Sequence, residues 1–250
     1  MKRLTNYHLK IIAIVTMVID HTCKIFLPQI HTLLTTYFSE QTAYIIYLSI
    51  ESLGRISFIL FAFMIAQGCH YTHDIKKYIQ RLLIFGIISE IPFQWMISVL
   101  SDQPFVPTIG FTNVFFTLAL GAIAIAGYQI MKQVKYLPLF ICCITAYLIN
   151  CDYGIIGILF IFLFYRLENI RLQMILIIII TFLQYIIVYP YINGIDNNTM
   201  ITIFFYFGYS LLSIPLIYSY NGERGKKMKL IFYAFYPIHI LILCTLYQWI

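Results

Sequence analysis

The chain has 250 residues, of which 61% are hydrophobic and only 10% are charged. Soluble domains contain about 25% charged residues, so the composition excludes a soluble globular protein and indicates a polytopic membrane protein. The formal net charge is +6, but the basic residues are spread over several short connectors. This distribution predicts a lipid bilayer, and not nucleic acid, as the partner of the chain.

A membrane-spanning helix needs about 20 predominantly apolar residues, within a range of about 17–25. Nine apolar segments are expected as spans, of which the fifth and sixth are short. The sequence therefore predicts an all-α membrane bundle that forms a single integral-membrane domain over residues 1–250. In chain order they cover residues 9–28, 42–67, 78–100, 111–131, 136–150, 153–166, 172–190, 199–219 and 230–249. No small-residue cleavage site follows the first segment, so it is expected to be retained and not removed as a signal peptide.

The connectors between these segments alternate in charge, which predicts a topology. One side holds fourteen of the sixteen basic residues, and the opposite side holds the acidic residues Glu40, Asp102, Asp152 and Asp196. By the positive-inside rule the N-terminus is cytoplasmic and the C-terminus is outside. The fourteen basic residues are Lys2, Arg3, Lys10, Lys76, Lys77, Arg81, Lys132, Lys135, Arg166, Arg171, Arg224, Lys226, Lys227 and Lys229.

Several ionisable residues lie inside the apolar segments, where a charge costs about 2.5–3.5 kcal/mol on insertion scales. His21, Arg55, Glu90 and His239 are expected near one level of the bilayer, with His21 roughly 18 Å from the cytoplasmic start of its helix. Two pairs have the i,i+4 spacing that places partners on one helix face: Asp20 with Lys24, and Glu51 with Arg55. Such residues mark either a functional site or self-neutralising pairs and satisfied core histidines, and the spacing alone leaves both readings open.

Metal chemistry has weak support in the sequence. The six cysteines have no metal or redox spacing and read as small packing residues. His70 and His73 form an HxxH pair, but the sequence identifies no third metal ligand, and metal sites need three or four. No metal is therefore expected.

Several polar motif blocks, in order along the chain, resemble the TraX family. The blocks are Leu9–Ala13, Met17–His21, Gly54–Phe58, Phe61–Phe63 with Gln67 and Gly68, Tyr78–Leu82, Ser89–Phe93, Asn113 with Phe116–Gly121, Asp152–Gly154 with Gly157, Tyr220–Gly222 with Gly225, and Phe235–His239. Two departures occur: Ser57-Phe58-Ile59 stands where a small residue, Phe and Pro are expected, and Tyr218-Ser219-Tyr220 replaces an apolar run to Tyr. Neither departure removes an ionisable motif residue.

The resemblance implies an acyltransferase in a bacterial plasma membrane, because the named activity of the family is N-terminal acetylation of conjugative pilin with acetyl-CoA as the implied donor. The chain is also similar to the wider transmembrane acyltransferases, which carry Lys or Arg, ten residues and then His in the first span. Lys10 and His21 match that spacing, which implies that His21 is catalytic and Lys10 assists. Eleven residues are about three helical turns, so both lie on one face of the helix.

The resulting hypothesis is transfer of an acetyl group from cytoplasmic acetyl-CoA to an acceptor that is membrane-embedded or outside: a pilin-like N-terminus, a secreted peptide or a cell-envelope glycan. An ion-coupled transporter and a non-catalytic membrane assembly factor are the alternatives. The catalytic candidates are His21 as base, Arg55 at the oxyanion, Glu51 or Glu90 as the orienting carboxylate, and His239 as a second acid/base group. Asp20 is also a catalytic candidate, but as the neighbour of His21 it points about 100° away on an ideal helix and is a poor direct orienter. The donor-binding candidates are Lys10, Lys76, Lys77, Arg81, Asn221, Arg224, Lys226 and Lys227, and the acceptor vestibule candidates are Asn113, Asp152 and Tyr153.

Overall fold

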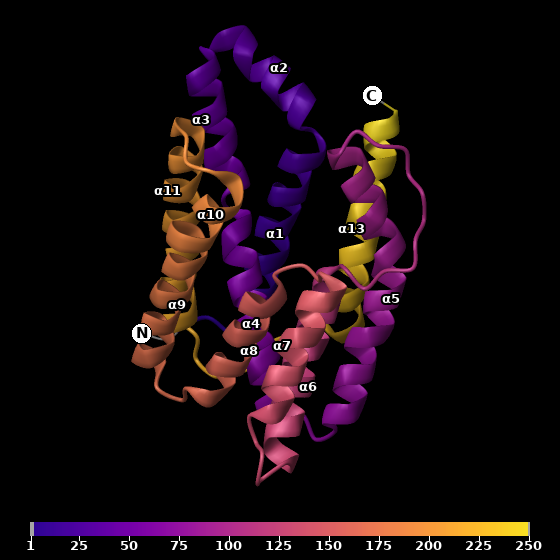
Figure 1. The fold of residues 1–250 in the computed structure, drawn as a ribbon, viewed down its shortest axis with the longest axis vertical. Helices are drawn as coiled ribbons and strands as arrows, with labels where there is room; N and C mark the ends of the chain where they lie inside the picture. The colour runs from indigo at the N-terminus through magenta and orange to yellow at the C-terminus, as the bar shows by residue number, and fades with distance from the viewer. Residues whose placement is uncertain (1–2, 250) are drawn as a thin grey trace. The chain divides into compact units, whose positions relative to one another are not determined.

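The computed structural model describes residues 3–249, so Lys2 lies outside the described residues, as does the side chain of Lys229. The described chain is helical and contains no β-strand, although Leu4 and Tyr220 form one isolated bridge. The helices (Figure 1) are α1 (Asn6–Ile25), α2 (Leu27–Tyr37), α3 (Glu40–Glu51), α4 (Gly54–Tyr71), α5 (Ile75–Leu100), α6 (Val114–Ile130), α7 (Leu137–Ile149), α8 (Gly154–Arg166), α9 (Ile170–Phe182), the π-helix η1 (Leu183–Val188), α10 (Tyr189–Asn193), α11 (Asn197–Leu211), α12 (Ser213–Tyr218) and α13 (Lys229–Gln248).

Within residues 3–249, five helical segments are long and apolar enough to cross a membrane, or six if the bent pair α1–α2 counts as one span. The five are Glu40–Tyr71, Ile75–Leu100, Ile170–Asn193, Asn197–Tyr218 and Leu230–Gln248. α6, α7 and α8 have 17, 13 and 13 residues, and 13 residues of helix span about 20 Å, less than a hydrocarbon core of about 30 Å. Helices therefore cover all nine expected ranges, whereas the count of nine spans and the orientation of the termini stay predictions.

The first expected span differs from the helix that forms. α1 ends at Ile25, and α2 leaves it at an angle of 80°. Pro28 occupies the first turn of α2, where its missing N–H costs nothing and its fixed φ suits a new helix. The sequence pattern missed α2, because residues 29–37 read as a connector.

The chain divides into two compact units, which are described separately. Unit 1 comprises Met1–Leu60, Ile177–Lys227 and Leu241–Ile250, and unit 2 comprises Phe61–Leu176 and Met228–Ile240. The expectation of one integral-membrane domain over residues 1–250 stays a prediction.

In unit 1, α3 packs against α1, α2 and α11 (Figure 1). A glycine allows α4 to begin directly on α1, since a Cβ at Gly54 would overlap the Cβ of Asp20 and lie 2.5 Å from its Cγ. The hydroxyl of Ser57 also donates to the carbonyl of Ala13 at 2.9 Å. This close approach brings charged side chains of the two helices together.

In unit 2, α6 packs against α5, α7 and α8 (Figure 1). Small residues make this packing close: a Cβ at Gly121 would lie 2.6 Å from Cδ1 of Ile161, and one at Gly127 would overlap Pro138. Small residues are typical of helix interfaces in membranes, because backbones gain dispersion contacts when they approach.

Candidate functional site

Four charged side chains meet in unit 1, at the end of α1 and at the break between α3 and α4. One Arg55 nitrogen lies 2.7 Å from Asp20 Oδ1 and 3.3 Å from Glu51 Oε1. Lys24 Nζ lies 3.0 Å from Asp20 and 3.5 Å from Glu51. Both predicted i,i+4 pairs therefore form, and the two carboxylates share the two cations across the helices. We call Asp20, Lys24, Glu51 and Arg55 the ion cluster.

The ion cluster is buried and balanced in formal charge. The side chains of Glu51, Asp20 and Arg55 are only 2%, 10% and 11% exposed, and that of Lys24 is 30% exposed. Burial of charges costs several kcal/mol per ion, and pairing offsets this cost only when the geometry is good. A cluster of this kind adds little net stability but fixes the relative position of the helices that carry it.

His21 lies beside the ion cluster on α1. Its Nε2 is 3.9 Å from Asp20 Oδ2, and its side chain is 11% exposed. This separation is longer than a hydrogen bond and is an electrostatic contact. Because α1 begins at Asn6, His21 lies about 22 Å along the helix from its first residue, and its depth in the bilayer stays a prediction.

Tyrosines of unit 1 surround the guanidinium of the ion cluster, and sequence reasoning missed them. Arg55 Cζ lies 4.6 Å from the centre of the Tyr206 ring, and the Tyr206 hydroxyl donates to Glu51 Oε1 at 3.2 Å. The rings of Tyr185 and Tyr189 pack edge-on against Tyr206. Tyr185 lies in the π-helix η1, a distortion that is frequent at functional sites. With 21 tyrosines in the chain, no sequence signal singled out these three.

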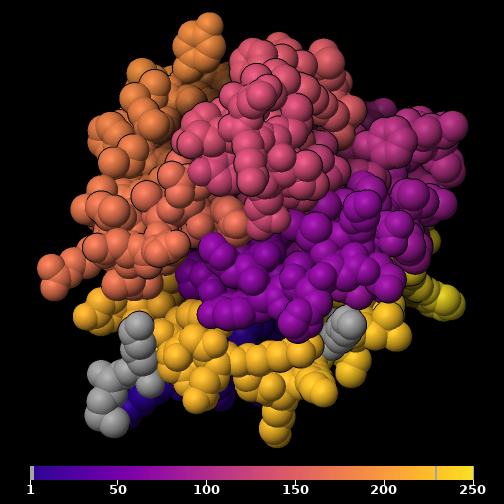
Figure 2. All heavy atoms as spheres, turned by 90° about the horizontal axis from the view of Figure 1, so that it is seen from below, coloured from indigo at the N-terminus to yellow at the C-terminus, as the bar shows by residue number. Residues whose placement is uncertain are grey.

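Basic residues gather at the start of α1, also in unit 1. The first turn of α1 binds the loop Ser219–Gly225, because Asn6 and Tyr7 donate their N–H groups to the carbonyls of Glu223 and Arg224. Figure 2 shows this yellow loop against the indigo N-terminal residues. The positive charges of Arg224 and Lys10 repel each other, and Lys226 Nζ lies 5.9 Å from the Tyr7 ring. Unit 1 thus contains five donor-binding candidates, namely Lys10, Asn221, Arg224, Lys226 and Lys227.

The other three donor-binding candidates lie at the start of α5 in unit 2. Asp74 caps this helix and lies 3.3 Å from Lys77 Nζ. The hydrogen bond from the Lys77 N–H lowers the pKa of Asp74 from its usual value. Lys76 neighbours this pair, and the guanidinium of Arg81 lies 5.9 Å from the Tyr78 ring. Lys77 is therefore partly neutralised by its own helix cap.

Glu90, in unit 2, binds neutral donors. Thr112 donates its hydroxyl to Glu90 Oε1 at 2.7 Å, Asn113 donates its side-chain amide to Oε2 at 2.6 Å, and the N–H groups of both residues also donate. Gln94 adds a bond at 3.1 Å. A carboxylate with so many donors is a strong structural anchor, since each is a charge-assisted hydrogen bond. Glu90 fastens the segment before α6 to α5.

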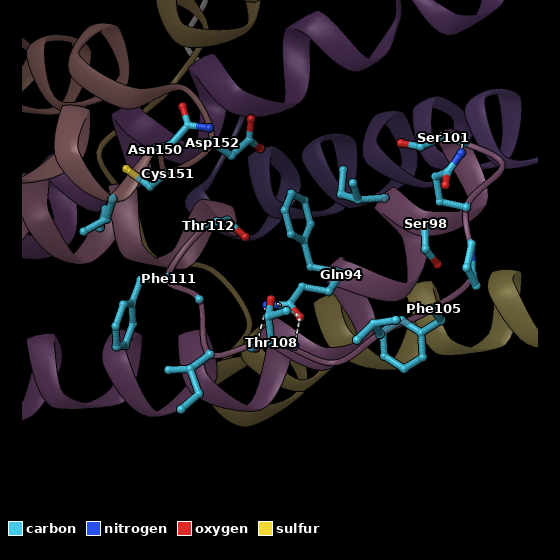
Figure 3. Close-up of a pocket in the computed structure, with 18 of the residues that line it drawn as sticks. Gln94, Ser98, Ser101, Phe105, Thr108, Phe111, Thr112, Asn150, Cys151 and Asp152 are labelled. Carbon is cyan, nitrogen blue, oxygen red and sulfur yellow. Dashed lines mark hydrogen bonds between the residues drawn. The ribbon is translucent and has the colours of Figure 1, made fainter.

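A cavity of about 930 Å³ lies in unit 2, between the end of α5, the segment 101–112 and the α7–α8 turn (Figure 3). Gln94 fixes its wall by accepting from the Thr108 N–H and donating to the Thr108 carbonyl, both at 2.9 Å. Two of the three vestibule candidates, Asp152 and Tyr153, line this cavity. The third, Asn113, is fully buried, caps α6 and donates to the Gly86 carbonyl.

The turn that carries Asp152 has a special backbone. Asn150 and Tyr153 both adopt positive φ, at 50° and 60°. The Asp152 N–H donates to the Thr112 carbonyl at 2.7 Å, and the Thr117 hydroxyl donates to the Asp152 carbonyl. These bonds tie the turn to the start of α6. Hydrogen bonds therefore fix both the α7–α8 turn and, through Gln94, the segment 101–112 that line the cavity.

His239 lies in unit 2 on α13 and is buried. Its Nδ1 is 2.9 Å from the Phe235 carbonyl one turn earlier, and the two rings stack with centres 5.0 Å apart. A hydrogen bond of this kind satisfies one ring nitrogen of a buried histidine within its own helix. It therefore fits the reading of His239 as a structural histidine as well as a catalytic one. Glu90 and His239 thus belong to unit 2, whereas His21, Asp20, Arg55 and Glu51 come together in unit 1.

Between residues 3 and 249, no three His, Cys, Asp or Glu side chains come together as a metal site requires. Comparison with known proteins gives three further findings. The chain is 27% identical over 249 residues to a protein of Dichelobacter nodosus named "Probable fimbrial assembly protein FimC, serogroup H1", an alignment that covers 96% of this chain and 94% of the relative. No solved structure matches the present chain. The family model described as TraX protein matches residues 6–247, nearly the whole chain, and the protein therefore belongs to the TraX family.

Proposed function

We propose that the protein is a membrane-bound acyltransferase that moves an acetyl group from cytoplasmic acetyl-CoA to an acceptor in or outside the membrane. The observation that carries the proposal is the placement of His21 beside the buried ion cluster, on a helix whose first turn binds the loop that carries Arg224 and Lys226. Histidine is the side chain that most often acts as a general acid or base in catalysis. The proposal places the protein in a bacterial plasma membrane, with nine spans, a cytoplasmic N-terminus and the C-terminus outside.

In the proposed reaction, His21 takes a proton from an acceptor hydroxyl or amine as that group attacks the thioester carbonyl. The new bond to the acetyl carbon forms, the carbon–sulfur bond breaks, and the proton passes from the imidazolium to the leaving thiolate of CoA. Asp20, at 3.9 Å, stabilises the imidazolium in the intermediate step. Arg55 already contacts Asp20 and Glu51, which favours a role in holding Asp20 over direct contact with the oxyanion.

The donor would be recognised at the start of α1. Coenzyme A carries phosphates, and Arg and Lys side chains suit phosphate oxygens. Lys10 and His21 share one face of α1 and are separated by about 16 Å along the helix axis. A thin, extended pantetheine arm reaching along this face would bring the thioester from Lys10, Arg224 and Lys226 to His21.

A non-catalytic assembly factor is the second candidate, and two observations favour it. The curated relative is named a fimbrial assembly protein, and the charges of the ion cluster neutralise one another without a ligand. In that case the ion cluster and His21 only fix helix packing. A pilin-like N-terminus is an acceptor for the enzyme and a client for the assembly factor, so the relative's name does not separate the two candidates.

The test is turnover of acetyl-labelled CoA by the purified full-length protein in lipid nanodiscs. Slow release or transfer of the label is expected in the wild type and should vanish in His21→Ala. His31→Ala is the matched control, because His31 is a half-exposed histidine of the same unit. Full turnover by a folded His21→Ala protein would refute the role of His21, and fimbriation of cells restored equally by His21→Ala would favour the assembly factor.

The donor site has a separate test. Arg224→Ala and Lys226→Ala should raise KM for acetyl-CoA while kcat at saturating donor is kept, because they remove binding of the distant phosphates only. Lys132→Ala, at an exposed position in the α6–α7 connector, is the control. If KM is unchanged when Arg224→Ala and Lys226→Ala are combined, these two residues do not bind the donor.

A further inference from the structure

The lining of the cavity in unit 2 restricts the charge of its ligand. None of its nineteen lining residues is Lys, Arg or His, and one, Asp152, is acidic. Anionic groups need cationic or abundant N–H donors, so the lining excludes phosphates. The volume of about 930 Å³ falls within the range of small-molecule sites, about 300–1,000 Å³.

The polar groups of the cavity are spread along its whole length. Figure 3 shows Ser98 and Ser101 at one end and Asn150 and Asp152 at the other, with Thr108 between them. A single ammonium group would use one end only and leave the remaining polar surface unmatched. A ligand that serves both ends carries several hydrogen-bonding groups along its own length, as a sugar does. The rings of Phe105 and Phe111 supply apolar faces for the C–H surfaces of such a ligand.

The backbone of the lining segment is poorly suited to an extended peptide. Pro104 and Pro107 have no N–H group, and the N–H groups of Gln103, Thr108 and Thr112 are bonded to Ser98, Gln94 and Glu90. Peptide recognition by strand addition needs alternating free backbone donors and acceptors. Pairing of an added strand is therefore interrupted at these five positions of the segment.

We propose that this cavity binds a neutral, hydroxyl-rich sugar group. The rim of the cavity carries exposed apolar side chains, with Val106 at 66% and Ile109 at 98% exposed, so the sugar has two sources: a free saccharide, or the head group of a glycan anchored in the membrane. Together with the proposed function, on which this step rests, such a site would make a glycan the acceptor of the acetyl group. The binding itself requires neither His21 nor a donor.

The test measures binding of tritiated dodecyl maltoside to full-length protein, purified in an amine-oxide detergent and reconstituted in lipid nanodiscs. Dodecyl phosphate, dodecylamine and an amidated apolar peptide serve as competitors with a different head, and maltose serves as the free sugar. Asn150→Gly removes the amide without backbone strain, because glycine readily adopts the positive φ of this position. Gln103→Ala removes a second lining amide, and Thr145→Ala, at a half-buried site on α7 of the same unit that does not line the cavity, is the control.

Saturable binding of the maltoside is expected, with about a fivefold loss of affinity in each of Asn150→Gly and Gln103→Ala, as for one lost hydrogen bond, and no loss in Thr145→Ala. Competition by maltose at similar concentration identifies a free saccharide, and competition only at far higher concentration identifies a membrane-anchored glycan. Competition by dodecyl phosphate, dodecylamine or the peptide as strong as that of the maltoside overturns the proposal, as does wild-type affinity in both amide variants. Acetyl-CoA turnover of the same samples reports separately on the proposed function.

Discussion

The contact between Asp20 and Arg55 can be tested with a double-mutant cycle. Asp20→Asn changes the formal charge of the ion cluster from zero to +1, and Arg55→Met changes it to −1. The double variant is neutral again. The cycle therefore separates the coupling of the two charges from the loss of each side chain.

The structure sets the expected magnitude. Removal of one partner from a buried ion pair costs about 3–5 kcal/mol, because the other charge stays buried without compensation. Two unit charges about 4 Å apart interact by about 4 kcal/mol at an effective dielectric constant of 20. We expect each single variant to lower the free energy of unfolding by about 3 kcal/mol, and the double variant to be more stable than additivity predicts by about 2 kcal/mol.

The measurement is equilibrium unfolding in mixed micelles with increasing SDS, followed by far-UV circular dichroism and tryptophan fluorescence. Coincidence of the two transitions supports two-state behaviour, on which the free energies depend. Asp74→Asn with Lys77→Met is the matched cycle on an exposed pair, 3.3 Å apart, and should give less than about 1 kcal/mol of coupling. A coupling between Asp20 and Arg55 below about 0.5 kcal/mol would show that the ion cluster does not hold α1 and α4 together.

Substitutions of Gly54, Tyr206 and Glu90 test the packing around the two sites, with the same unfolding assay unless another is named. Gly54→Ala should lower the free energy of unfolding by about 1–3 kcal/mol because its methyl group overlaps Asp20, whereas Gly208→Ala, with open space around it, should raise it by up to about 1 kcal/mol; equal effects would contradict the close approach. Tyr206→Phe should cost about 1 kcal/mol for the lost hydroxyl bond, and Tyr206→Leu about 0.5–2 kcal/mol more for the lost ring beneath the guanidinium, so equal losses would argue against the ring contact. Glu90→Gln should cost about 1–3 kcal/mol because its amide faces donors and should speed proteolytic cleavage within residues 101–112, and an unchanged cleavage rate would refute the anchoring role.

The sequence by itself determined the local features. Apolar runs located the helices because the bilayer requires long apolar segments with internally satisfied backbones. The pairs Asp20–Lys24 and Glu51–Arg55 followed from the i,i+4 spacing, since helix geometry alone brings such residues to one face. The motif blocks identified the family that the family model confirms.

The tertiary structure decided which helices share their charges. Hydropathy and spacing show that an ionisable residue lies in an apolar segment, but they do not show which distant helix carries its partner. The Asp20–Arg55 contact depends on the close approach at Gly54, and the Tyr206–Glu51 bond joins residues 155 positions apart. The donors of Glu90 likewise lie 22 and 23 positions away, across a loop whose path no periodicity encodes. The 80° bend after Ile25 was equally hidden, because an apolar run looks the same whether its helix continues or turns.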